Sequence, residues 1–110
     1  VKLVTNKQSE ALYFSRAPIP WNRSGMPLSA SDDLSAWKRH VGIYAYRVGF
    51  LKRYVCLPQG ALERLECLEQ LRVLECGEKI YVAHSNIVSE AGIDTEEDLK
   101  RVAQTILGSP

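Results

Sequence analysis

The sequence has no excess of charge of either sign and no long apolar run. Its 14 Lys and Arg residues nearly balance its 13 Asp and Glu residues, which leaves a formal net charge of +1 over 110 residues. Binding to nucleic acid usually requires a broad basic surface, so this balance argues against a nucleic-acid partner. A membrane span needs roughly 20 consecutive apolar residues, and no stretch of the sequence approaches that length. We therefore expect no nucleic-acid partner and no insertion into a membrane.

Cysteine is scarce. Cys56, Cys67 and Cys76 are an odd number of thiols, and no pair has the C-x-x-C spacing of zinc sites. This pattern argues against structural zinc and against a disulfide framework, and it favours a reducing, cytoplasmic location. We expect the three side chains to be small apolar members of the core.

The length and the average composition, 45% hydrophobic and 25% charged, are those of one globular domain. We therefore treat residues 1–110 as a single unit. The chain starts at Val1 without a methionine, directly on a strand-like segment, as a continuation of a longer chain would. Residues 22–39 are rich in Gly, Pro, Ser and Asp, which predicts a long mobile loop with a short helix near residues 34–38.

Hydrophobic periodicity predicts alternating strands and helices. The expected strands cover residues 1–5, 11–16, 40–48 and 79–85, and the expected helical segments cover residues 49–55, 61–77 and 92–107. The first two strands are separated by a short polar turn and should form a hairpin. This order of elements predicts an α/β layered architecture.

Residues 40–46, HVGIYAY, raise the first functional question. In a strand, successive side chains point to opposite faces, so His40, Tyr44 and Tyr46 would share one face with Gly42, and the apolar residues between them would face the core. An imidazole and two phenols offer donors and acceptors, and a glycine leaves space for a ligand. This face suits a polyhydroxylated molecule. The alternative is a set of polar side chains that meet a neighbouring loop.

The predicted helix 61–77 carries a second candidate. At 100° per residue, Glu69 falls on the same apolar stripe as Leu65 and Val73, with Gln70 beside it toward the polar side. A carboxylate on such a stripe must be paired, hydrated in a cleft or protonated. Glu69 is therefore either a ligand-binding carboxylate or a partner in an ion pair with an arginine.

Two charged residues at the ends of elements are further candidates. Asp94 or Thr95 should cap the last helix, with Glu97 or Asp98 completing a capping box. Asp94 could alternatively hold Mg²⁺, which is usually bound by one or two carboxylates together with phosphates and water. Arg16, at the end of the second strand, is either an anion-binding residue or an ordinary surface charge.

Four segments together carry a resemblance to a known family. They are ALYFSRAPIPW (11–21), RHVGIYAYRVGFLKRYV (39–55), LERLECLEQLRVLECGEKIYVA (62–83) and GIDTEEDLKRV (92–102). In this order they resemble the C-terminal half of the 3-deoxy-manno-octulosonate cytidylyltransferases, the CMP-Kdo synthetases. The resemblance covers essentially the whole chain except residues 22–36. It implies the C-terminal portion of a Rossmann-like nucleotidyltransferase, with a mixed sheet and flanking helices that are incomplete without the N-terminal half.

The resemblance also implies an activity and a substrate pocket. Members of this family transfer CMP from CTP to Kdo, an eight-carbon sugar acid, and release pyrophosphate in a Mg²⁺-dependent step of lipopolysaccharide synthesis. The family's Kdo pocket maps onto His40 and Tyr44 in the RHVGIY block and onto Glu69 and Gln70 in the LEQLR block.

The catalytic residues that the resemblance implies are Arg16 in the YFSRA block and Asp94, which is also the metal ligand. The family's phosphate-binding loop and cytosine contacts lie in the N-terminal half, which these residues do not include. We therefore expect residues 1–110 alone to be inactive and to need that half, within a cytoplasmic homodimer. Two alternatives remain open: a nucleotidyltransferase for another acidic sugar, and a non-catalytic dimerisation or sugar-binding module.

Overall fold

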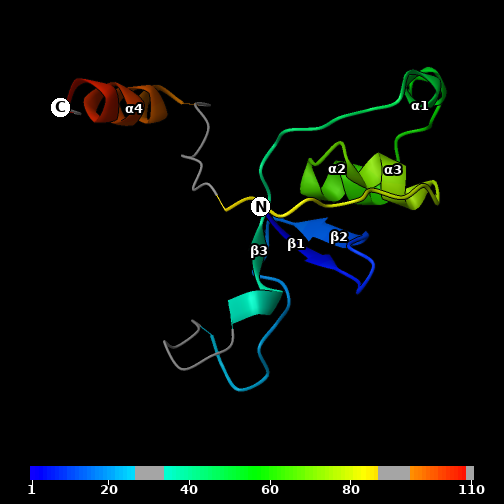
Figure 1. Ribbon diagram of the computed structural model, residues 1–110, viewed down its shortest axis with the longest axis horizontal. Helices are drawn as coiled ribbons and strands as arrows, with labels where there is room; N and C mark the ends of the chain where they lie inside the picture. Colours follow the sequence, from blue (N-terminus) through cyan, green and yellow to red (C-terminus); the bar gives the residue numbers. More distant parts are fainter. Residues whose placement is uncertain (27–33, 87–94, 109–110) are drawn as a thin grey trace.

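The computed structural model describes residues 1–26, 34–86 and 95–108 (Figure 1). In chain order its elements are β1 (Lys2–Thr5), β2 (Ala11–Ser15), the 3₁₀ turn η1 (Leu34–Ala36), β3 (Lys38–Arg39), α1 (Val48–Tyr54), α2 (Ala61–Glu66), α3 (Leu71–Glu75) and α4 (Glu96–Gly108). The three strands form an antiparallel sheet in the order β2-β1-β3, and α2 and α3 lie beside β2 (Figure 1).

The predicted hairpin is confirmed. β1 and β2 pair antiparallel, with Leu3 opposite Phe14. The turn between them is organised by Asn6, whose side-chain oxygen accepts hydrogen bonds from the backbone N–H groups of Gln8 and Glu10, both at 2.9 Å. Asparagine is favoured in turns because it can bond the backbone two residues ahead in this way.

The predicted strand at residues 40–48 is wrong, because regular pairing ends with β3 at Arg39. β3 pairs with β1 in a register that places Arg39 opposite Lys2. The His40 N–H then donates to the Val1 carbonyl at 2.9 Å. The segment that follows His40, up to Arg47, adopts no regular secondary structure.

The predicted strand at residues 79–85 is also wrong in extent. The Ala11 N–H donates to the Ile80 carbonyl, and the Val82 N–H donates to the Ser9 carbonyl, both at 2.8 Å. These bonds surround a single bridge between Glu10 and Tyr81. The segment therefore crosses the turn end of the hairpin without becoming a fourth strand.

The predicted helix 61–77 is broken into α2 and α3. Cys67 ends α2 in the left-handed conformation, with φ 52° and ψ 48°, which is uncommon for a residue other than glycine. Arg16, about fifty residues earlier, stabilises this break. Its Nε donates to the Glu66 carbonyl at 2.6 Å, and a terminal guanidinium N–H donates to the Cys67 carbonyl at 3.0 Å. These carbonyls at the end of α2 would otherwise lack a helical donor.

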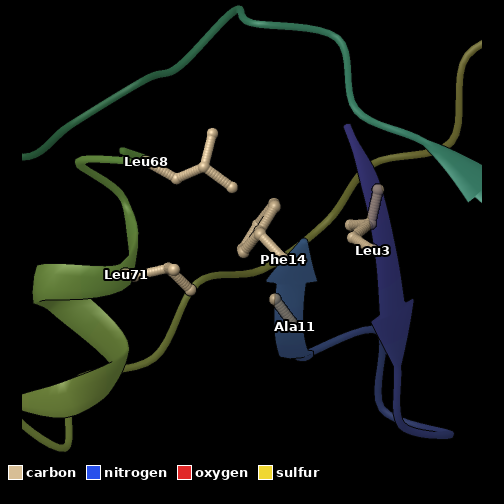
Figure 2. Close-up of a cluster of buried hydrophobic side chains, with 5 residues drawn as sticks. All are labelled: Leu3, Ala11, Phe14, Leu68 and Leu71. Carbon is tan, nitrogen blue, oxygen red and sulfur yellow. The ribbon is translucent and has the colours of Figure 1, made fainter. Parts of the chain in front are cut away.

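A small hydrophobic core joins the hairpin to the α2–α3 pair (Figure 2). Its members are Leu3, Ala11, Phe14, Leu68 and Leu71. Phe14 and Leu71 are fully buried, and Figure 2 shows the Phe14 ring between Leu68 on one side and Leu3 on the other. Burial of a side chain of this size contributes roughly 1.5–3 kcal/mol, so these two residues do most to hold the sheet against α3.

Two carboxylates tie α2 to α3. Glu63 is buried and receives both arms of the Arg72 guanidinium, at 2.7 Å each. Glu75 accepts a hydrogen bond from the Leu62 N–H at 2.7 Å and so caps α2 from outside the helix. A Cβ on Gly60, the N-cap residue, would lie 1.2 Å from a Glu75 carboxylate oxygen. Glycine at this position therefore leaves space for the cap.

The loop predicted at residues 22–39 is described only in part, because residues 27–33 lie outside the described residues. The short helix expected near residues 34–38 is confirmed as η1, and β3 follows it inside the same range. The Trp37 indole N–H donates to the Pro20 carbonyl at 2.8 Å and joins the two sides of the loop.

Helices α1 and α4 confirm the predicted helical segments. Thr95 and Asp98 form the capping box of α4: the Asp98 N–H donates to the Thr95 hydroxyl, and the Thr95 N–H donates to the Asp98 carboxylate, both at 3.1 Å. Helix α4 buries none of its residues and lies away from the sheet in Figure 1. Within residues 1–26, 34–86 and 95–108, no helix has the length and apolar character needed to cross a membrane.

Much of the chain surface is exposed. Its accessible area is 8706 Å² for a mass of 12.4 kDa, whereas a compact monomer of that mass exposes about 6,100 Å². The expectation that the cysteines belong to the core is wrong, because all three are exposed. A small core and a large exposed area leave the described fold dependent on a few contacts.

We expect Glu63→Gln to lower the free energy of unfolding by about 1–3 kcal/mol, because it removes a buried charge-assisted pair. The Arg72 guanidinium holds the pKa of Glu63 below its usual 4.5. The contribution of the pair should therefore be complete above about pH 4.5 and be lost as the pH falls through the lowered pKa. Urea unfolding of the chain at several pH values measures this difference.

The matched control is Glu78→Gln, which breaks an exposed pair with Arg53 at 3.4 Å and should cost no more than about 1 kcal/mol. Equal losses for the two variants, or a Glu63→Gln deficit that does not shrink in acid, would contradict the assigned role of Glu63.

Candidate functional site

The site begins with the His40–Tyr44 pair. His40 follows β3 directly, and a hydrogen bond of 2.5 Å joins its Nε2 to the Tyr44 hydroxyl. The Phe14 ring meets the imidazole edge-on, with ring centroids 5.5 Å apart and an interplanar angle of 86°. The hydrophobic core therefore supports one side of His40, and Tyr44 contacts it from another.

Tyr46 joins this pair, as the alternation of side chains predicts. Its ring stacks on Tyr44 at a centroid distance of 5.7 Å and an interplanar angle of 11°. The shared face of His40, Tyr44 and Tyr46 is thus present without a strand. The expectation for the opposite face is wrong: Val41 is exposed, and Ile43 is 84% exposed, because no layer covers that side of the described chain.

Burial keeps the His40–Tyr44 pair uncharged near neutral pH. Loss of solvent lowers the pKa of His40, whereas the Glu69 carboxylate raises it. Burial, with smaller contributions from Tyr46 and Glu69, raises the pKa of Tyr44 to about 12. A neutral imidazole and a protonated phenol supply hydrogen-bonding groups that suit hydroxyls better than a charged partner would.

Glu69 and Gln70 lie in the turn between α2 and α3. The helical stripe on which we placed Glu69 does not exist, because the helix ends at Glu66. Glu69 is exposed, yet its charge acts on His40, Tyr44 and Tyr46. The Glu69 carboxylate therefore lies near enough for its charge to act on these three side chains, although about 25 residues separate the two segments in the chain.

Gln70 is only 4% exposed, and its Nε2 has no hydrogen-bond partner among the described residues. A buried donor left in this way costs about 1–3 kcal/mol. Such a cost is recovered when a ligand oxygen or a water accepts the bond. Gln70 is thus the described side chain that has most to gain from a bound acceptor.

An open hollow of about 300 Å³ borders the turn. Its lining residues are Gln59, Glu63, Arg64, Cys67, Leu68 and Glu69. Glu69 lines this hollow, and its charge also acts on His40 and Tyr44.

Arg16 and Asp94 remain predictions as catalytic residues. Arg16 contacts the carbonyls at the end of α2, two residues before Glu69, which explains its position by a structural role. Asp94 lies outside the described residues. Thr95 caps α4 through its hydroxyl. Within the described residues, no three His, Cys, Asp or Glu side chains gather as a metal site.

Sequence reasoning missed the residues that support this site from α1. Phe50 stacks on Tyr46 at 5.7 Å, and Tyr54 follows at 6.1 Å from Phe50. The available signal was the four-residue spacing of Tyr46, Phe50 and Tyr54, which places side chains on one face of a helix.

The comparisons with known proteins agree with this description. Residues 1–80 match the family model described as Cytidylyltransferase. A 3-deoxy-manno-octulosonate cytidylyltransferase of Xanthomonas campestris pv. campestris (strain 8004) is 54% identical over 112 residues, which cover 99% of this chain and 44% of the relative. The enzyme of the same name from Serratia proteamaculans (strain 568) is 51% identical over 98% of this chain and 43% of its own length.

A solved structure is similar as well. It is described as CMP:2-keto-3-deoxy-manno-octonic acid synthetase complexed with CTP, and it matches with a TM-score of 0.73 and 37% sequence identity over 97% of this chain and 41% of that chain. This likeness confirms the fold class predicted from the resemblance. The chain spans less than half of the length of the proteins it matches.

The effect of the Glu69 charge on His40 predicts that a substitution of Glu69 will change the pKa of His40. Glu69→Gln removes a negative charge that raises the pKa of His40, so the variant should titrate at a lower pH than the parent chain. NMR titration of the imidazole signals measures this. Glu78→Gln serves as the control, since Glu78 is paired with Arg53 and is not among the charges that act on His40. An unchanged or raised His40 pKa in Glu69→Gln would show that the Glu69 carboxylate is too far from His40 to affect its titration.

Proposed function

The chain belongs to the cytidylyltransferase family, and on this premise we propose that it forms the sugar-binding portion of an enzyme that transfers CMP from CTP to Kdo. The products are CMP-Kdo and pyrophosphate, and the pathway served is lipopolysaccharide synthesis. Relatives at 51–54% identity that carry this enzyme name support the proposal. The similar structure, described as a complex with CTP, supports CTP as the nucleotide substrate.

The observation that carries the proposal is the hydrogen-bonded His40–Tyr44 pair, on which the charge of Glu69 acts. The pair is uncharged near neutral pH, and the adjacent carboxylate can accept bonds from hydroxyls. Gln70 adds a buried amide donor without a described partner. Together these groups match a sugar acid, which presents many hydroxyls that both donate and accept.

In this proposal the residues act mainly by binding and orientation. Nucleotidyl transfer requires the attacking hydroxyl to lie in line with the α-phosphate, and holding the two reactants in that geometry can supply much of the acceleration. The His40–Tyr44 pair would form the wall against which the sugar lies. Glu69 and Gln70 would fix its rotation, so that the anomeric hydroxyl points toward the nucleotide.

Arg16 and Asp94 complete the proposed site. Arg16 would place positive charge at the α2 corner, near the anionic groups of the substrates. Asp94 would be the ligand that this chain offers to Mg²⁺, and the ion would neutralise phosphate charge during transfer. The chain's own residues do not make a complete metal site within the described part, so the remaining ligands would come from substrate phosphates, water and the rest of the enzyme.

The chain should need further protein to act. It covers 41% of the structure described with CTP, and we propose that the N-terminal half of the family's enzymes supplies the nucleotide site. The accessible area, about 40% above that of a compact monomer, supports contacts with further protein. We propose that the whole enzyme is a cytoplasmic homodimer.

A chimaera tests the proposed activity. In it, this chain replaces the matching segment of the Xanthomonas campestris relative, and pyrophosphate release is measured with CTP and different sugar acids. The chimaera should turn over Kdo, whereas residues 1–110 alone should release no pyrophosphate. Turnover of a sialic acid but not of Kdo would contradict the sugar assignment. A folded chimaera without any activity would favour a non-catalytic module.

His40→Ala in the chimaera should raise the KM for Kdo about 10- to 100-fold, because it removes a hydrogen-bonding group and leaves its partner Tyr44 unpaired. The KM for CTP should change little. His84→Ala removes the same side chain from an exposed position and should leave both constants near their parent values. If His40→Ala raised both KM values equally, or neither, the residue would not belong to the sugar wall.

A further inference from the structure

Four aromatic side chains form a stack that runs from the site into α1. We call Tyr44, Tyr46, Phe50 and Tyr54 the aromatic ladder. Successive centroids are 5.7, 5.7 and 6.1 Å apart, and the first two pairs are nearly parallel, with interplanar angles of 11° and 7°. Offset-stacked aromatic pairs are favourable at roughly 4.5–7 Å, so each ring supports the next along the whole ladder.

The far end of the ladder is fixed by buried charge. The Arg72 guanidinium carbon lies 5.2 Å from the centroid of the Tyr54 ring, within the range of a cation–π contact. The same guanidinium bonds both oxygens of the buried Glu63. Arg53, on α1 itself, lies over Phe50 at 5.5 Å. The ladder thus connects the α2–α3 pair to the His40–Tyr44 pair.

The segment that carries Tyr44 has little other support. From Val41 to Tyr46, the backbone hydrogen bond found among the described residues is the one from the Ile43 N–H to the Val41 carbonyl, at 2.8 Å. No strand pairs with this segment within the described part of the chain. The Tyr44 side chain is therefore held by its hydrogen bond to His40 and by contacts between rings.

The rings of the aromatic ladder are also more exposed than the side chains of the hydrophobic core. Tyr46 is 47% exposed, and Tyr44 and Phe50 are only partly buried, whereas the core residues Phe14 and Leu71 are almost completely covered. Partial exposure with regular stacking is what a support for an open binding surface requires.

We propose that the aromatic ladder is a positioning device: stacking of Phe50 on Tyr46 holds Tyr44, and through it His40, in the orientation that receives the sugar. The inference rests on the proposed function for its substrate, because Kdo is the ligand that the pair would meet. Phe50 and Tyr54 are then positioning residues that touch no substrate.

The test compares three substitutions in the chimaera. Phe50→Leu keeps an apolar side chain but removes the ring, and it should raise the KM for Kdo about three- to tenfold while the KM for CTP stays within twofold. Phe50→Tyr restores a ring and should recover the parent KM. Val48→Ala, at an exposed position on the same helix, should leave both constants unchanged.

A second measurement is independent of the substrate. In the 110-residue chain, Phe50→Leu should shift the imidazole NMR signals of His40, identified by their loss in His40→Ala, whereas Phe50→Tyr and Val48→Ala should not. This readout holds even if the chimaera proves inactive toward Kdo, which would overturn the proposed function alone. Unmoved His40 signals in Phe50→Leu would overturn the ladder. Equal rises of both KM values in Phe50→Leu, or a failure of Phe50→Tyr to restore binding of Kdo, would also overturn the proposed role of the ladder.

Discussion

The burial of one aromatic ring, Phe14, connects the fold to the site. On one side it packs with Leu68 and Leu71 and so fixes the α2–α3 pair against the hairpin. Its edge also meets the His40 imidazole at a centroid distance of 5.5 Å. Because the core contains few residues and much of the surface is exposed, this ring contributes both to the packing of the sheet and to the position of His40, which Tyr44 contacts as well.

The site also depends on the break between α2 and α3. Arg16 bonds the carbonyls where α2 ends, and Cys67 turns the chain through the left-handed region. The break places Glu69 and Gln70 in a turn, where the carboxylate reaches solvent and the amide is buried. In an unbroken helix, Glu69 would lie on an apolar stripe. The structural role of Arg16 therefore determines where the proposed sugar-binding groups lie.

The sequence predicted what depends on local interactions. The hairpin, α1, α4 and the capping box at Thr95 all follow from patterns within a few residues, and all are present. The strand at 40–48 was wrong, because the segment after His40 adopts no regular secondary structure. The helix 61–77 was wrong because a distant residue, Arg16, stabilises the break between α2 and α3. Alternation alone predicted that His40, Tyr44 and Tyr46 share a face. The assignment of His40, Tyr44, Glu69 and Gln70 to a sugar pocket came from the resemblance, and the stacking of Phe50 and Tyr54 beyond Tyr46 was missed.

The central claim is that residues from the His40 segment and the Glu69 turn bind one sugar acid together. The most direct measurement is a crystal structure of the chimaera with Kdo and a non-hydrolysable CTP analogue. The account predicts a Kdo molecule whose hydroxyls contact His40 and Tyr44 and accept a hydrogen bond from the Gln70 amide, with Glu69 on the same ring. Kdo bound elsewhere, with the Gln70 amide still without a partner, would contradict it.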